Sequence, residues 1–315
     1  MSTFSTISDP PARHHPVSSL LDLRVLAGIN RLELLASQVM DGFVQGLHRS
    51  AHVGFALDFA QHRQYVPGDD IKRIDWRVYA KADRFYIKQY EVTTNLRATI
   101  VLDTSASMGY QGGGGAAPAT KLRYGQWLAA ALGYMVLHQQ DTAGLVTFDS
   151  EIREWIGARS APSHLMNIIN ALEKATPANV SAIAPVLHQI ADRVGTRGMV
   201  IIISDFFCPL PELSDALHHL KHRRQETLLL QILDPDELIF PFHNMGSFEN
   251  VEDPADRLKL DPALVRAAYL EALGQHLHEM EHLAGKLNFS YALFDTATPL
   301  DQALLHYLAR RLGSR

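Results

Sequence analysis

The sequence predicts an α/β protein built on a doubly wound, mostly parallel sheet flanked by helices, with a smaller N-terminal helix and β segment. Apolar runs of strand length alternate along the chain with segments of helical periodicity. The runs at residues 98–102 and 198–203 are continuous and rich in β-branched residues, which is typical of strands buried on both faces of a parallel sheet. Each run ends close to an aspartate, and closely spaced serines follow the first.

The other elements follow from periodicity and from the placement of prolines. Strands are expected at residues 143–148, 227–233 and 289–294, with a short edge strand at 152–156. Helices are expected at residues 120–139, 163–175, 181–194, 262–286 and 299–311. Pro185 is tolerated because it lies near the first turn of its helix, and Pro299 suits a first helical turn. In such sheets ligands bind beyond the carboxyl ends of the strands.

The most informative motif, Asp103-Thr104-Ser105-Ala106-Ser107, directly follows the first apolar run. Alternate residues of a tight loop can direct one carboxylate and two hydroxyls at the same point. Oxygen ligands of this kind suit Mg²⁺, Mn²⁺ or Ca²⁺ rather than zinc or copper. The plainer interpretation is a strand-ending turn whose side chains bond the local backbone.

The D-x-S-x-S pattern resembles the metal-ion-dependent adhesion site of von Willebrand factor A domains. Asp205 stands where those domains place a second aspartate. The resemblance also implies a hydroxyl ligand from the loop before a later helix, where Ser181 is the nearest candidate and Thr176 is the alternative.

The same resemblance implies roles for these residues. Ser105 and Ser107 would contact Mg²⁺ directly, while Asp103 and Asp205 would hold it, directly or through waters. A vacant position on the metal would then accept a carboxylate from a partner protein. The implied function is metal-dependent protein binding without catalytic residues.

Upstream motifs make the resemblance narrower. The order resembles the bacterial family called domain of unknown function 58, and it runs Gly46-Leu47-His48-Arg49-Ser50, then Tyr65-Val66-Pro67-Gly68-Asp69-Asp70, then Arg73-Ile74-Asp75-Trp76, then the motif at Asp103. The similarity covers roughly residues 40–312, with Asp58 standing where glutamate is expected. Members of this family are typically partnered with MoxR-class AAA+ ATPases, so the resemblance implies such a partner.

The block from Tyr65 to Trp76 has two interpretations. It fits a β-hairpin whose alternating charges pair across the strands and whose Trp76 lies in the core. It also fits a partner-docking surface beside the metal site, and the candidate residues for that role are Asp70, Arg73, Asp75 and Arg77.

A rival motif, His278-Glu279-Met280-Glu281-His282, matches the H-E-x-x-H pattern of zinc peptidases. The two histidines share a helix face, and Glu279 could act as general base. A third ligand is missing, because Asn288 stands where the longer pattern has histidine and no glutamate follows Glu281. A metal-dependent hydrolase, whether this zinc peptidase or a Mg²⁺-dependent phosphatase, is therefore the alternative function.

Composition sets the remaining expectations. A net charge of −5 and a pI near 6.3 give no global attraction to nucleic acid. The single cysteine, Cys208, excludes an intrachain disulfide and fits a reducing compartment. Charges within Leu20 to Val39 favour a soluble amphipathic helix over a membrane span, and no signal peptide is visible. A cytoplasmic protein without membrane insertion is expected.

The expected organisation has three parts. Residues 1–16 form a disordered tail, residues 17–95 a helix and β-hairpin segment, and residues 96–315 the von Willebrand factor A-like domain.

Overall fold

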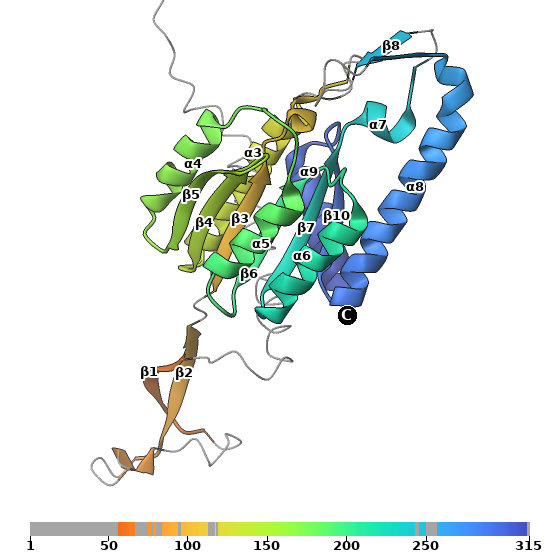
Figure 1. Cartoon of the computed structure of the whole chain (residues 1–315). Helices are drawn as coiled ribbons and strands as arrows, with labels where there is room; N and C mark the ends of the chain where they lie inside the picture. Colours follow the sequence, from red (N-terminus) through yellow and green to blue (C-terminus); the bar gives the residue numbers. More distant parts are fainter. Residues whose placement is uncertain are drawn as a thin grey trace, which may run out of the picture.

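The computed structural model describes residues 56–66, 75–76, 78–79, 84–93, 96–112, 117, 119–242, 246–249 and 257–313. The expected N-terminal tail and the helix at Leu20 to Val39 lie outside these residues. Within them the main body is a layered α/β structure, and a separate β-hairpin precedes it in the chain (Figure 1).

The central sheet has six strands in the order β10-β7-β6-β3-β4-β5. These strands are β3 (Arg97–Asp103), β4 (Thr142–Phe148), β5 (Ile152–Arg159), β6 (Met199–Ser204), β7 (Glu226–Leu233) and β10 (Ser290–Asp295). Every neighbouring pair is parallel except β4 and β5, which are antiparallel. The predicted doubly wound, mostly parallel sheet is therefore confirmed.

Helices cover both faces of this sheet. They are α3 (Lys121–His138), α4 (His164–Lys174), α5 (Ile183–Arg193), α6 (Leu210–His222), α7 (Pro235–Ile239), α8 (Pro262–Leu287) and α9 (Leu300–Gly313), with a 3₁₀ turn, η3, at Ala106–Gly109. The helices predicted at these places agree within a few residues at each end. The sequence interpretation missed α6 and α7, and also a small pair of strands, β8 (Gly246–Glu249) and β9 (Arg257–Leu260).

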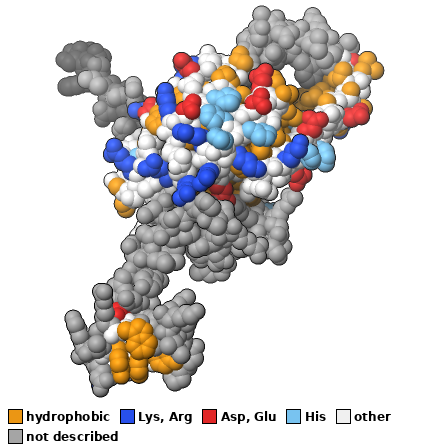
Figure 2. Space-filling view, turned by 60° about the horizontal axis from the view of Figure 1, so that its bottom comes forward, with side chains coloured by type: hydrophobic (Ala, Val, Ile, Leu, Met, Phe, Trp, Pro, Cys, Tyr) orange, Lys and Arg blue, Asp and Glu red, His pale blue; other side chains and the backbone are white. Residues whose placement is uncertain are grey.

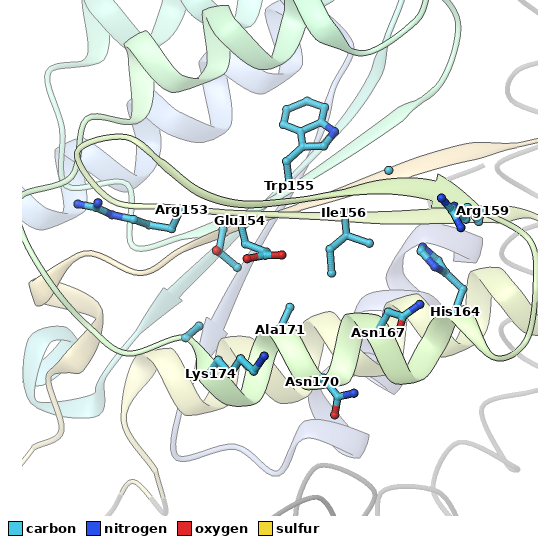
Figure 3. Close-up of a pocket in the computed structure, with 13 residues that line it drawn as sticks. Arg153, Glu154, Trp155, Ile156, Arg159, His164, Asn167, Asn170, Ala171 and Lys174 are labelled. Atoms are coloured by element: carbon cyan, nitrogen blue, oxygen red, sulfur yellow. The ribbon is translucent and has the colours of Figure 1, made fainter.

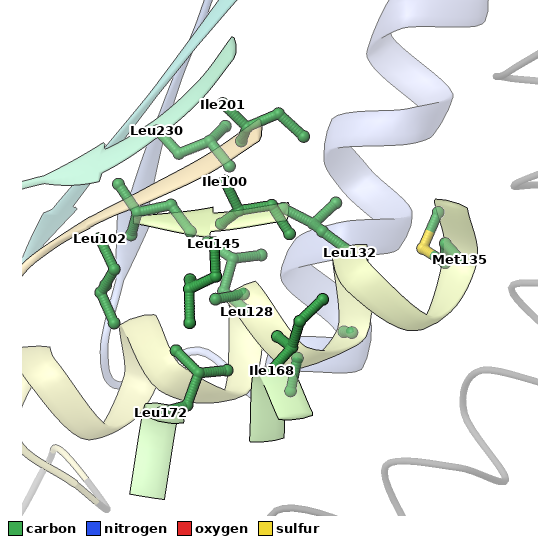
Figure 4. Close-up of a cluster of buried hydrophobic side chains, with 14 of the residues drawn as sticks. Ile100, Leu102, Leu128, Leu132, Met135, Leu145, Ile168, Leu172, Ile201 and Leu230 are labelled. Atoms are coloured by element: carbon green, nitrogen blue, oxygen red, sulfur yellow. The ribbon is translucent and has the colours of Figure 1, made fainter. Parts of the chain in front are cut away.

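Alternate residues of each strand supply two separate cores, because successive side chains point to opposite faces of a sheet. On one face, Ile100 and Leu102 of β3 pack with α3, α4 and α9 (Figure 4). On the other face, Val101 of β3 and Ile202 of β6 pack with α5, α6 and α8. Double-sided burial explains why β3 and β6 are apolar without alternation.

Most of the hairpin predicted over Tyr65 to Trp76 falls on residues 67–74, which lie outside the described residues. The described hairpin is formed by β1 (Ala56–Gln64) and β2 (Tyr86–Thr93), which pair antiparallel on either side of that block. Asp75 instead starts a helical turn, since its backbone oxygen accepts from the N–H groups of Val78 and Tyr79.

The prediction that Trp76 lies in the core is wrong, because its side chain is 57% exposed. The indole makes edge contacts with Tyr79 and Phe85, at ring-centroid distances of 6.1 and 6.4 Å. Apolar side chains therefore reach the surface of this part of the molecule (Figure 2).

Candidate metal centre

The predicted ligands lie at the carboxyl edge of the sheet, where β3 and β6 run side by side. Asp103 is the last residue of β3, and Asp205 directly follows Ser204, the last residue of β6. Leu102 and Ile203 are aligned in the parallel register, so both strands end at the same level. The chain proceeds from β3 to β4 on one side and reaches β6 on the other. This is the switch point of the sheet, where doubly wound folds bind ligands.

The carboxylate of Asp103 is buried and organises the hydroxyls around it. Its Oδ1 accepts a hydrogen bond from the backbone N–H of Ser105 at 2.8 Å. Its Oδ2 accepts from the hydroxyls of Ser181 at 2.9 Å and Ser204 at 2.7 Å. A serine that donates its proton to a carboxylate keeps its oxygen lone pairs for another partner. The Ser181 oxygen therefore keeps lone pairs that could bind a cation.

The hydroxyls of Ser105 and Ser107 are hydrogen-bonded to each other, and their spacing is also compatible with a small hard cation. Their Oγ atoms lie 3.1 Å apart. Two neighbouring corners of a Mg²⁺ octahedron with metal–oxygen distances of about 2.1 Å lie roughly 3.0 Å apart. The two hydroxyls fit adjacent positions around such an ion, and this donor set of oxygens alone matches the chemistry of Mg²⁺.

The third loop, residues 175–182, reaches the site because backbone hydrogen bonds attach it to the motif. Ala178 N–H donates to the Thr104 carbonyl at 2.9 Å, and Ala106 N–H donates to the Asn179 carbonyl at 2.8 Å. Asn179 has a φ of 56°, a left-handed conformation that asparagine tolerates better than most residues. Of the two hydroxyl candidates, the structure brings Ser181 to Asp103 and leaves Thr176 exposed.

Close packing between the motif and this loop depends on Gly109. A Cβ at this position would lie 2.9 Å from Cγ of Pro177, which is closer than side-chain atoms normally approach. The glycine that ends η3 thus permits the approach of the third loop to the motif.

Asp205 is held by a buried lysine that the sequence interpretation missed. Lys121 Nζ lies 2.9 Å from Oδ2 of Asp205 and 2.6 Å from Oε1 of Glu237, and its side chain is almost wholly buried. The ammonium also lies 5.3 Å from the ring centroid of Phe207. Among the described residues, Asp205 Oδ1 receives only a long contact from Phe207 N–H, at 3.4 Å. One oxygen of Asp205 is thus neutralised, and the other has little competition for a cation.

The residue between Asp205 and Phe207 is conformationally strained. Phe206 has a φ of 54°, an unusual value for an aromatic residue. Its N–H donates to Ser204 Oγ at 3.0 Å, and its ring is buried in the core, so packing and hydrogen bonding hold the strain. Strained residues of this kind cluster at functional sites.

The electrostatics of the strand ends favour a cation. Burial, followed by the nearby charge of Asp205, raises the pKa of Asp103 to about 6. Burial would lower the pKa of Lys121, but Asp205 and Glu237 together hold it above its ordinary value. With three carboxylates (Asp103, Asp205, Glu237) and one ammonium (Lys121), the ionised group carries a charge of −2, which a divalent cation would balance.

A further acidic residue, Asp234, follows β7 at the same edge. Asp234 Oδ2 accepts from Gly112 N–H at 3.0 Å, and a Cβ at Gly112 would collide with the carboxylates of Asp234 and Asp236. The Glu237 side chain accepts from Asp234 N–H at 2.8 Å, which completes the capping box of α7. This network ties α7 to Lys121 and hence to Asp205.

The sequence contained signals for these additional residues. Asp234 follows a predicted strand, as Asp205 does. Lys121 lies in the first turn of the helix predicted at residues 120–139, where the helix dipole disfavours a cation. A lysine in that position indicates an acidic partner.

The other candidate residues lie elsewhere. Asp70, Arg73 and Arg77 are outside the described residues, and Asp75 is buried in the turn between β1 and β2. Their docking role stays a prediction.

His278, Glu279 and His282 are exposed on α8. Glu279 accepts a hydrogen bond from Gln275 at 2.8 Å. In the described part of the chain, no three His, Cys, Asp or Glu side chains gather as a metal site, so the H-E-x-x-H motif has no third ligand there.

Fold and site together define an α/β domain with a site of hydroxyls and carboxylates at the switch point of its sheet. The family described as "Protein of unknown function DUF58" matches residues 61–279, so the chain belongs to this family. Uncharacterized proteins of Mycobacterium tuberculosis and Mycobacterium bovis are each 28% identical over 284 residues, covering 86% of this chain and 86% of the relative. The family resemblance in the sequence is confirmed.

Several solved structures are similar to part of this chain, with low TM-scores and low sequence identity. An aerotolerance-related membrane protein from Bacteroides fragilis has a TM-score of 0.44 at 16% identity, covering 68% of this chain and 99% of that one. The BatB protein from Bacteroides thetaiotaomicron has a TM-score of 0.43 at 14% identity, covering 69% and 99%. The SpRpn10 VWA domain has a TM-score of 0.39 at 9% identity, covering 70% and 96%. Among the described helices of this chain, none is long and apolar enough to cross a bilayer.

Proposed function

We propose that this protein is a non-enzymatic module that binds another protein through a divalent cation, preferably Mg²⁺. The observation that carries the proposal is the convergence of three serine hydroxyls with two buried carboxylates at the switch point of the sheet. Ser105 and Ser107 lie 3.1 Å apart, and Ser181 is oriented by Asp103 at 2.9 Å.

Ser105, Ser107 and Ser181 would bind the cation through their hydroxyl oxygens. Asp103 would orient these hydroxyls, and Asp205 would supply negative charge through its less occupied Oδ1, directly or through water. The ion, when bound, would supply a positive centre able to take up one more oxygen ligand.

A carboxylate from a partner protein is the natural further ligand. The cation would balance the charge of −2 carried by Asp103, Asp205, Glu237 and Lys121 together, which would reduce the repulsion that a new anion meets. Val180 and Phe207 flank the site in sequence and are 51% and 43% exposed. Apolar side chains next to a charged anchor suit a protein surface better than a free ion.

The family resemblance implies the partner class, a MoxR-class AAA+ ATPase. We expect this ATPase to associate with the protein in Mg²⁺ and to dissociate in EDTA. The double substitution Ser105→Ala/Ser107→Ala should abolish the Mg²⁺-dependent part of binding, and Asp103→Ala should do the same. Ser214→Ala, which removes a hydroxyl from the remote helix α6, is the matched control. Association that is equal in Mg²⁺ and EDTA would refute the role of the metal.

The competing function, a metal-dependent hydrolase, has one observation in its favour. His276 of α8 packs its ring 5.9 Å from the ring of Phe207, and its Nε2 is buried with no hydrogen-bond partner among the described residues. It is the imidazole that could serve as a base near the strand ends. We expect no phosphatase or peptidase turnover; turnover that is lost in His276→Ala would favour the hydrolase instead.

A further inference from the structure

A cavity of about 600 Å³ lies between the edge strand β5 and the helix α4 (Figure 3). Ile156 of β5 and Ala171 of α4 face each other across it. Charged and amide side chains surround this apolar part. Cavities of this size hold small organic molecules rather than single ions.

The strongest indication of a ligand is His164, which lines this cavity as the first residue of α4. Its side chain is only 4% exposed, yet neither Nδ1 nor Nε2 has a hydrogen-bond partner among the described residues. An imidazole carries at least one N–H in every protonation state. A buried N–H without an acceptor is unfavourable, so the site calls for an acceptor that the described chain does not provide.

The charges around the cavity indicate whether that acceptor is neutral or anionic. Arg159 and Lys174 line it, and neither makes a hydrogen bond or ion pair within the described part of the chain. Arg153 also lines the cavity, but its guanidinium is occupied by Asp149, with both carboxylate oxygens at 2.8 Å. Glu154 is the one acidic side chain among the described lining residues. The two uncommitted cations therefore leave an excess of positive charge.

The groups that could bind an anion gather at one end of the cavity. Arg159 and His164 lie at the same end of the cavity, and Asn167 lies one helical turn further along α4 (Figure 3). His164 begins an eleven-residue helix, so the positive end of the helix dipole points to this end as well. A guanidinium, an imidazole N–H and a helix N-terminus converge on one place.

We infer that this cavity binds a small organic anion, whose carboxylate or phosphate group contacts Arg159 and His164. The organic part of the ligand lies between Ile156 and Ala171, with the amide of Asn167 beside it. None of the proposed metal ligands lines this cavity.

The test uses three probes at constant ionic strength in Mg²⁺-free buffer: inorganic phosphate, adenosine monophosphate and succinate. We expect saturable one-to-one binding of at least one probe in isothermal titration calorimetry. Binding of the phosphates alone assigns a phosphate group, and binding of succinate alone assigns a carboxylate. The absence of saturable binding for all three probes would overturn the inference.

Two variants locate the binding. Arg159→Ala should weaken it at least tenfold, whereas Arg193→Ala should leave it unchanged. Arg193 does not line the cavity, and its guanidinium lies 5.4 Å from the ring of Trp155, which points away from α4 (Figure 3). Ala171→Leu should abolish binding by filling the cavity, with an unchanged circular dichroism spectrum as evidence that the variant folds. Affinity that is unchanged in both Arg159→Ala and Ala171→Leu would refute the assignment.

Discussion

The strand-end site and the β5–α4 cavity are two polar regions of one sheet, and they differ in how their polar groups are satisfied. At the strand ends, Asp103, Asp205 and Lys121 all find partners within the chain. In the cavity, His164 is more deeply buried than many core side chains and has no partner among the described residues. The strand-end side chains are held by one another, whereas the cavity contains a buried imidazole without a described partner.

Because of this difference, the two sites should contribute to the stability of the fold in different ways. A buried ion pair strongly destabilises a protein when one member is removed, because the remaining charge is left without compensation. A buried polar group that lacks a partner already weakens the folded state, and its removal relieves that cost. Substitutions at the two sites should therefore change stability in opposite directions.

The largest effect is expected for Lys121→Ala. This change leaves Asp205 and Glu237 in the protein interior without their shared ammonium group. We expect a loss of about 3–5 kcal/mol in the free energy of unfolding, measured by urea denaturation in EDTA. The control is Lys174→Ala, which removes an exposed lysine and should leave stability nearly unchanged. Equal losses of stability for Lys121→Ala and Lys174→Ala would contradict the stabilising role of the buried ion pairs.

A somewhat smaller effect is expected from Mg²⁺ itself. A ligand that binds only the folded state at 100 times its Kd stabilises it by about 2.7 kcal/mol. For a domain of this size this is a rise of a few degrees in Tm, measurable by differential scanning calorimetry. We expect the rise in the parent protein and in Ala171→Leu, but none in Ser105→Ala/Ser107→Ala. A rise in the double variant would show that the ion binds elsewhere.

The smallest effect is expected for His164→Leu in buffer without organic anions. Removing an imidazole without partners should stabilise the protein by about 1 kcal/mol, at the cost of the proposed anion binding. His188→Leu is the matched comparison, because its Nδ1 lies 3.1 Å from Nδ1 of His219 and it should lose stability instead. Destabilisation by His164→Leu would indicate that this imidazole has a partner after all.

The sheet and most of its helices could be predicted from sequence because their signals are local. The continuous apolar runs of β3 and β6 follow from burial on both faces. Helix α6 was missed because its sequence, rich in charged and histidine residues, buries a narrow stripe. The block around Trp76 was misjudged because charge alternation suggests a strand, whereas the oxygens of Asp75 stabilise a helical turn.

The strand-end site and the cavity likewise differ in how far a local sequence signal reveals their residues. Asp103, Ser105 and Ser107 are neighbours in sequence, and Asp205 marks a second strand end, so a motif could show them. The contacts of Lys121 with Asp205 and Glu237 span 84 and 116 residues and depend on the folded sheet. Arg159, His164 and Lys174 follow no motif, and their importance comes from burial and from missing partners, which only the structure provides.

The most direct test of the metal site is anomalous diffraction from crystals of the protein soaked in Mn²⁺. We expect a single strong peak at the carboxyl ends of β3 and β6, about 2.1 Å from the hydroxyl oxygens of Ser105 and Ser107. A peak at His278 and His282, or none at the strand ends at saturating Mn²⁺, would contradict it.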